Sequence, residues 1–273
     1  MDSQLEDMEP EKLVRKNRFT ISVIFPFVGG VTLLASAEGL LPEMVSYNPF
    51  LIIFGTLVMR LPLVAGMRPL LGRKAFLGLG FLTFYSYFIE FVGVRTGFPY
   101  GDFEYGIDLG PMILGEVPLG LPVFFIPLVV NAYLLVLLLF RERSQSFFFR
   151  LLTVTGTVLL LDFVLDPAAV AINFWSYSSG FYYGVPLSNY LGWVLSASVA
   201  VLTLDMFLSR EGLYERLEKC GFFLDDMVSF VFLWGLVNLY FLNLVPFVLS
   251  LFLGLALWKT DRFDFVSAKD LPI

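Results

Sequence analysis

Long apolar runs recur along this chain and decide what it can fold into. Each run approaches the roughly 20 residues that an α-helix needs to cross a bilayer. They lie at residues 19–39, 47–66, 75–95, 117–140, 147–166, 186–208, 224–241 and 245–259. Hydrophobic residues make up 58% of the 273-residue sequence, and the mean hydropathy of +0.79 excludes an ordinary soluble domain. We therefore predict an all-α fold: a polytopic integral membrane helical bundle with eight transmembrane helices.

The last two runs leave an alternative open. Residues 224–259 form two short helices that turn near residues 243–246, or one long kinked helix that would reduce the crossings to seven. We expect a single membrane domain over residues 19–259, with polar tails at 1–18 and 260–273. The polar stretch at 209–221 is equally compatible with a short interfacial helix and with a solvated loop.

Basic residues alternate between the two sides of the predicted membrane domain. They occur in the N-terminal tail, in every second link and in the C-terminal tail. They are Lys12, Arg15, Lys16, Arg18, Arg68, Arg73, Lys74, Arg141, Arg143, Arg150, Arg210, Arg216, Lys219, Lys259, Arg262 and Lys269. Because cytoplasmic loops carry the excess of Lys and Arg, we predict a multi-pass protein of the cell membrane with a cytoplasmic N-terminus.

The residues that are absent restrict the chemistry. The sequence contains no histidine and a single cysteine, Cys220, so histidine-based triads and Cys or His metal sites cannot be built. A net charge of −6 disfavours a nucleic-acid partner. Dinucleotide, P-loop and zinc-protease motifs are missing, and we expect neither a metal nor a cofactor. Acid–base chemistry therefore falls to Asp, Glu and Tyr.

Four ionisable residues inside the apolar runs are the main candidates for chemistry. Asp162 and Asp166 lie four positions apart and share one face of a helix. Because Asp166 precedes a proline, we expect the helix to end there. A polar helix end that meets water is the simpler alternative to a catalytic role for the two aspartates. Glu90 has aromatic and aliphatic neighbours, so we expect a protonated acid there, unless it only makes a packing hydrogen bond. Arg60 needs a carboxylate partner or a route to the interface, and near the other three it would set their charge.

Two segments between the runs, residues 95–122 and 162–193, concentrate Pro, Gly, aromatic and acidic residues. Their rings fit an interfacial belt, and they also fit a pocket that stabilises a carbocation. Four further acids are interleaved with the rings of the first segment, where a solvated face is the favoured interpretation: Asp102, Glu104, Asp108 and Glu116.

Particular stretches of these segments resemble the carotenoid biosynthesis protein family. They are EFVGVRTGFPYG at 90–101 with Tyr105 and LGP at 109–111, LDFVLDP at 161–167 with Trp175, and YGVPLSNYLGW at 183–193. The resemblance covers roughly residues 20–260. It implies a hydro-lyase that adds water across the terminal C=C of an acyclic carotenoid to form a tertiary alcohol. In the halophile branch, which the acidic composition fits, it implies conversion of bisanhydrobacterioruberin to bacterioruberin.

The resemblance places the family's acid positions on Glu90, Asp162 and Asp166. From the chemistry of the reaction we expect Glu90 or Asp162 to donate the proton and Asp166 to help to place the water. The expected end-group pocket consists of Arg60, Tyr100, Tyr105, Trp175, Tyr183, Asn189 and Trp193. Expected partners are the lipophilic carotenoid, water, membrane lipid and other membrane enzymes of the pathway.

Two other function classes compete with the hydratase. The spacing of Asp162 and Asp166 also fits a membrane prenyltransferase that binds Mg²⁺–diphosphate, but a second acidic motif and nearby basic residues are not evident. Loss of activity with EDTA would identify that enzyme. A non-enzymatic carotenoid carrier would instead bind the pigment without turnover.

Overall fold

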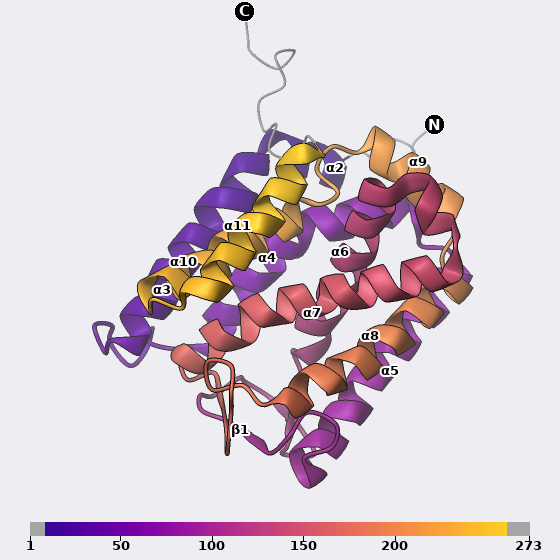
Figure 1. The fold of residues 1–273 in the computed structure, drawn as a ribbon. Helices are drawn as coiled ribbons and strands as arrows, with labels where there is room; N and C mark the ends of the chain where they lie inside the picture. Colours follow the sequence, from indigo (N-terminus) through magenta and orange to yellow (C-terminus); the bar gives the residue numbers. More distant parts are fainter. Residues whose placement is uncertain (1–8, 261–273) are drawn as a thin grey trace, which may run out of the picture.

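The computed structural model describes residues 9–260, and within them every predicted apolar run forms a helix (Figure 1). The helices that match the eight runs are α3 (Phe25–Ala37, preceded by a π-helical turn at Thr20–Ile24), α4 (Pro49–Met67), α5 (Arg73–Thr96), α6 (Leu121–Phe140), α7 (Phe147–Ala171), α8 (Leu187–Phe207), α10 (Asp225–Tyr240) and α11 (Leu244–Lys259). The chain is therefore helical, as predicted, with short strands added in the links.

Six of these helical segments are long and apolar enough to cross a membrane, among the residues that the structure describes. They are Thr20–Ala37, Pro49–Leu70, Arg73–Thr96, Leu121–Gln145, Phe147–Ala171 and Leu187–Phe207. Helices α10 and α11 have 16 residues each and pack against one another, separated by a turn before Leu244. The region 224–259 is therefore two helices, and the single kinked helix that we had kept as an alternative is wrong.

Two shorter helices lie at the end of the bundle that carries the basic links. Helix α2 (Glu9–Lys16) occupies part of the predicted N-terminal tail, and α9 (Arg210–Lys219) occupies the polar stretch at 209–221 (Figure 1). Helix α9 buries Leu213 and Leu217, so this stretch is a packed helix and not a solvated loop. The predicted tail residues 1–8 and 261–273 lie outside the described part of the chain.

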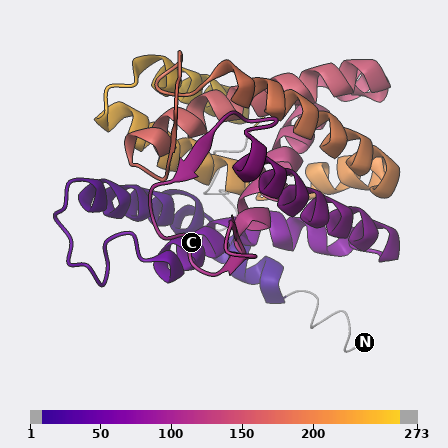
Figure 2. The ribbon, with the colours of Figure 1, turned by 90° about the horizontal axis from the view of Figure 1, so that it is seen from below.

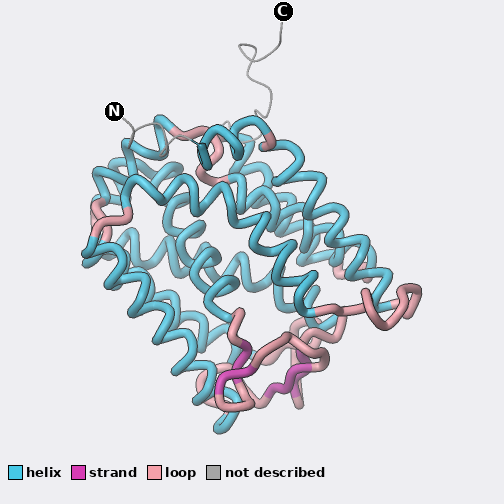
Figure 3. The backbone as a smooth tube through the Cα atoms, turned by 180° about the vertical axis from the view of Figure 1, so that it is seen from behind, coloured by secondary structure: helices cyan, strands magenta, loops and turns pink. Residues whose placement is uncertain are grey.

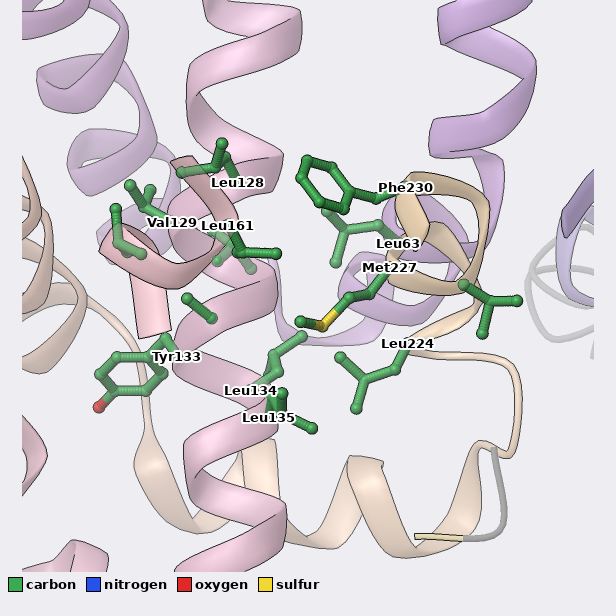
Figure 4. Packing of buried hydrophobic residues seen from close by; sticks show 14 of the residues in the cluster. Leu63, Leu128, Val129, Tyr133, Leu134, Leu135, Leu161, Leu224, Met227 and Phe230 are labelled. Carbon is green, nitrogen blue, oxygen red and sulfur yellow. The ribbon is translucent and has the colours of Figure 1, made fainter. Parts of the chain in front are cut away.

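Helix α6 is the centre of the bundle. It contacts α4, α5, α7, α8 and α10, and 67% of its hydrophobic segment is buried, more than in any other candidate span among residues 9–260. Its side chains Leu128 and Leu134 lie towards Leu161 of α7 and Met227 of α10, whereas Tyr133 points away from α10 (Figure 4). Helices α4 and α5 both contact α6 but make no extensive contact with each other, which leaves space beside α6.

Helix α7 continues five residues beyond its predicted end at Asp166. Pro167 has no N–H to donate, and the carbonyl that it leaves free, Phe163 O, accepts a hydrogen bond from Tyr182 Oη at 3.4 Å. The helix ends instead at Ala171, and Asn173, two residues further on, adopts the left-handed φ of 59°. The N–H groups of Asn173 and Phe174 close the end by donating to Val170 O and Ala169 O. The helix end predicted at Asp166 is therefore wrong. The side chain of Tyr182 supplies the hydrogen bond that Pro167 cannot donate.

Short strands join the two Pro- and aromatic-rich segments at the opposite end of the bundle from α2 and α9 (Figures 1 and 3). Strand β1 (Phe103–Tyr105) pairs antiparallel with β4 (Trp175–Tyr177), and β2 (Met112–Ile113) pairs with β3 (Val117–Pro118). The view onto this end shows the strands and loops crossing over the helix ends (Figure 2). Segments about 70 residues apart in sequence thus form one cover.

Candidate active site

A partly open cavity of about 1160 Å³, its open side included, lies beneath this cover and against α6. It is bounded by α4 (Pro49, Ile52, Ile53), α5 (Ser86, Ile89, Glu90), α6 (Leu121, Phe124, Phe125, Leu128), α7 (Leu165, Asp166), α8 (Asn189, Trp193) and α10 (Trp234). The links add Tyr100, Phe103, Tyr105, Leu109, Pro118, Gly120, Phe174, Trp175 and Tyr177. The lining is therefore aromatic and aliphatic, with carboxyl groups from two helices.

The β1–β4 ribbon supplies the aromatic roof. Side chains alternate between the two faces of a strand, so Phe103 and Tyr105 point one way and Glu104 points the other. The register pairs Tyr105 with Trp175 and Phe103 with Tyr177, which places all four rings on the cavity side. The Phe103 ring lies 5.7 Å from that of Tyr105 and 6.1 Å from that of Tyr177. Glu104 is exposed, as its position on the outer face requires.

Two carboxyl groups face the cavity, and each accepts a hydrogen bond from a tyrosine hydroxyl. Tyr105 Oη donates a hydrogen bond to Glu90 Oε1, and Tyr177 Oη donates to Asp166 Oδ2 at 3.1 Å. Burial, reinforced by the neighbouring carboxyl groups, raises the pKa of both phenols far above its usual value. Both tyrosines therefore remain protonated and act as hydrogen-bond donors to the acids.

A third carboxyl group lies directly behind the cavity. Asn189 Nδ2 donates to Asp162 Oδ2 at 3.0 Å and to Asp166 Oδ2 at 2.5 Å, so one amide links the two aspartates. Asp162 is fully buried, and its Oδ1 has no hydrogen-bond partner among the described residues. Carboxylates that share a low-dielectric site without a cation cannot all ionise readily. The arrangement therefore favours a state in which one carboxyl group keeps its proton and another is ionised. The protonated group can act as an acid and the ionised group as a base.

Helix α8 holds the rings on the other wall. Tyr100 Oη bonds with Ser196 Oγ at 2.7 Å, and the Tyr100 ring packs on Gly192. A Cβ at Gly192 would lie 2.5 Å from that ring, so glycine is what allows Tyr100 to approach the helix. Trp193 stacks on Phe125 of α6, with centroids 5.7 Å apart and planes inclined by 17°. These contacts hold the aromatic wall in place.

Most of the predicted site residues meet in this one cavity. Glu90, Asp166, Tyr100, Tyr105, Trp175, Asn189 and Trp193 all line it. Asp162 does not line it, but contacts it through Asn189.

Two expectations need correction. Tyr183 lies outside the cavity wall, where its Oη accepts a hydrogen bond from the N–H of Val245 at 3.3 Å. Arg60 does not line the cavity and does not set the charge of the three acids; it forms an ion pair with the fully buried Asp226 of α10 instead. The expected carboxylate partner of Arg60 therefore exists, but it is Asp226, which was not among the candidate residues.

Other residues were missed or had been ranked low. Tyr177 and Trp234 line the cavity but were not singled out, although the position of Tyr177 two residues after Trp175 places both on the same face of a strand. The four acids of the first segment, by contrast, do not line the cavity. Glu116, for example, pairs with Arg95, which lowers the pKa of Glu116.

The described residues offer no obvious cation site. No group of three or more Cys, Asp or Glu side chains within residues 9–260 is arranged to hold a metal ion, and no Lys or Arg of that part lines the cavity. Recognition of a diphosphate normally uses such groups. The chemistry that the cavity can perform with its own side chains is proton transfer to and from an apolar molecule.

Comparison with known proteins agrees with this geometry. The sequence pattern of the family described as carotenoid biosynthesis protein matches residues 47–257, which include every cavity-lining residue. The chain is 62% identical over 255 residues to the bisanhydrobacterioruberin hydratase of Haloarcula japonica, covering 93% of this chain and 87% of that protein. No solved structure matches the chain. By sequence and along most of its length, the chain belongs to the carotenoid biosynthesis protein family.

Proposed function

We propose that this protein is a carotenoid hydratase that converts bisanhydrobacterioruberin into bacterioruberin by adding water to a terminal C=C. The 62%-identical relative is named a bisanhydrobacterioruberin hydratase, which supports this proposal. The observation that carries the proposal is that Glu90 and Asp166, from different helices, face one aromatic cavity next to lipid-facing helices. That arrangement supports protonation of an apolar alkene and capture of the resulting cation by water.

Glu90 is the proposed proton donor. Its Oε1 accepts from Tyr105, which leaves Oε2 to carry the proton that is transferred to the less substituted alkene carbon. The C=C π electrons form the new C–H bond, and the neighbouring carbon becomes a tertiary cation. The rings of Phe103, Tyr105 and Trp175 line the same space and stabilise positive charge through their faces. Glu90 becomes a carboxylate that Tyr105 stabilises.

Asp166 is the proposed base. A water oxygen bonds to the tertiary cation, and Asp166 takes the proton that the water loses, which completes the alcohol. The indole N–H of Trp175 has no partner among the described residues and is available to hold that water. Asp162 and Asn189 are positioning residues, because they reach the cavity through their bonds to Asp166. The proton on Asp166 returns to Glu90 through solvent before the next turnover.

The carotenoid enters from lipid in this proposal. The cavity extends from α4 to α5 across the face of α6, and these two helices make no extensive contact with each other. Half-buried Ile53 and Phe124 lie on this side. A lipophilic substrate can therefore slide between α4 and α5 without passing through water.

We also propose how the protein sits in the membrane. Residues 19–259 form a single domain with eight crossings, in which α10 and α11 complete the six longer spans, and the N-terminus is cytoplasmic. The basic links and the β1–β4 cover lie at opposite ends of the bundle, which supports this orientation.

The direct test replaces each acid by its amide in cells that supply the anhydro carotenoid. Mass spectrometry of the extracted pigment measures the gain of one water, about 18 Da, at each hydrated end. We expect Glu90→Gln and Asp166→Asn to lose about 10²- to 10⁴-fold in rate, the usual contribution of a general acid or base. Glu104→Gln, on the outer face of β1, is the matched control and keeps wild-type activity. Wild-type turnover by either cavity variant would refute the roles assigned here.

A further inference from the structure

A second, smaller cavity lies deeper along the same helices. It has about 470 Å³ of empty space, any open part included, and is lined by Thr56, Met59, Arg60, Phe124, Leu128, Asn131, Leu161, Leu165, Met227, Phe230, Leu233 and Trp234. We call it the inner chamber. Leu128 and Leu161 form one side of this region, and Met227 and Phe230 of α10 form the other (Figure 4).

The inner chamber continues the active-site cavity. Phe124, Leu128, Leu165 and Trp234 line both spaces, and so they form the boundary between them. Along α7, Asp166 belongs to the active site and Leu161 to the inner chamber. Five residues of helix correspond to a separation of about 7.5 Å. A molecule whose alkene lies beside Asp166 can therefore extend a neighbouring part into the inner chamber.

Apart from Thr56, whose hydroxyl already donates to Ile52 O, the polar residues in the wall of the inner chamber are Arg60 and Asn131. Arg60 pairs with Asp226 Oδ1, and Asn131 Nδ2 donates to Asp226 Oδ2, so the guanidinium and the amide share one carboxylate. Arg60 Nε also donates to Val123 O at 3.2 Å. Asn131 is 3% exposed, and its Oδ1 has no hydrogen-bond partner in the described structure. A buried acceptor without a hydrogen-bond donor costs folding free energy, so we expect a bound molecule to donate a hydrogen bond to Asn131 Oδ1.

The surroundings specify the kind of donor. The pair of Arg60 and Asp226 is balanced in charge, and most of the remaining wall is apolar, so an ionic ligand would lack a counter-ion. A neutral O–H group is small enough and meets the one open acceptor. The reaction proposed above supplies two molecules with such a group, namely an alcohol-bearing carotenoid and water.

We propose that the inner chamber binds a hydroxyl group through Asn131 Oδ1. The inference rests on the proposed hydratase function, and it makes Asn131 a residue that determines specificity. The hydroxyl belongs to the carotenoid end group or to a stored water molecule. If it belongs to the carotenoid, the enzyme prefers substrates that already carry an alcohol near the terminal C=C.

The test compares Asn131→Leu with wild type on two acyclic carotenoids, one with a hydroxyl group near the reacting end and one without. Thr203→Val is the matched control, because Thr203 is also buried, its Oγ1 already donates to Val199 O, and it lines neither cavity. A tenfold or greater fall in kcat/KM for the hydroxylated carotenoid alone would identify the carotenoid hydroxyl. A fall in kcat on both substrates, with KM and the unfolding midpoint unchanged, would identify water.

Other outcomes overturn the proposal. Unchanged kinetics on both substrates would do so, and so would an equal loss accompanied by a lower unfolding midpoint, which a purely structural role predicts. If Asn131→Leu does not fold, tryptophan quenching in the wild-type protein replaces it, because Trp193 and Trp234 line the cavities. Tighter binding of the hydroxylated carotenoid would then support the carotenoid hydroxyl as the bound group, and equal affinity for the two carotenoids would overturn that assignment. Failure of the hydratase function is separate: it appears as no hydration of either carotenoid by the wild type.

Discussion

Replacing Tyr105 by phenylalanine tests whether Glu90 is the acid or the base. Tyr105 Oη donates to Glu90 Oε1, and its ring belongs to the cavity roof. The substitution keeps the ring and removes only the donor. If Glu90 gives up its proton in the rate-limiting step, the bond to Tyr105 is stronger in the transition state than before it, because the acceptor gains charge.

The expected size follows from that difference. A hydrogen bond to a neutral acceptor contributes about 0.5–1.5 kcal/mol net and one to a charged acceptor about 1.5–3 kcal/mol. Only the difference, about 1–1.5 kcal/mol, acts on the rate, and it corresponds to a roughly 5- to 13-fold lower kcat. We expect little change in KM, because the ring that contacts the substrate is retained.

The assay is hydration of the anhydro carotenoid in detergent or vesicles, followed by chromatography of the alcohol. The matched control is Tyr87→Phe on α5, the helix that carries Glu90, because Tyr87 Oη donates to Leu119 O and its side chain does not line the cavity. This control should stay within about twofold of wild type. An unchanged or higher kcat for Tyr105→Phe would refute the reasoning, since losing a donor would make Glu90 a stronger base.

Two further substitutions test the packing that supports the site. Asp226→Asn removes the charge that balances Arg60, and we expect a loss of about 3–5 kcal/mol in stability, measured by denaturant unfolding in detergent; an unchanged midpoint would contradict the buried ion pair. Gly192→Ala brings a Cβ within 2.5 Å of the Tyr100 ring, so we expect hydration to fall at least tenfold. Gly156→Ala, where nothing lies within 4 Å, should leave activity unchanged; equal effects of the two alanines would exclude the close approach as the cause.

The acids and rings of the site were readable from the sequence because their environment is set locally. A carboxyl group within an apolar run, such as Glu90 or Asp162, stands out by composition alone. The same rule pointed to Arg60 and required a partner for it. It could also have drawn attention to Asn131, which lies within an equally apolar run. Asp226 was harder to recognise, because it lies in the first turn of α10, where acids are common.

What the sequence by itself determined is the set of apolar helices and a chemistry without histidine, since hydropathy and composition act residue by residue. Tertiary structure decided which residues meet. The register between β1 and β4 places four rings on the cavity side, and the Asn189 amide donates to two aspartates. The hydrogen bond from Tyr182 to Phe163 O accompanies the continuation of α7 beyond Pro167. Tertiary structure also separated Arg60 from the acids. These outcomes depend on hydrogen bonds and packing between residues far apart in the chain, and no local pattern encodes the partner of such a bond.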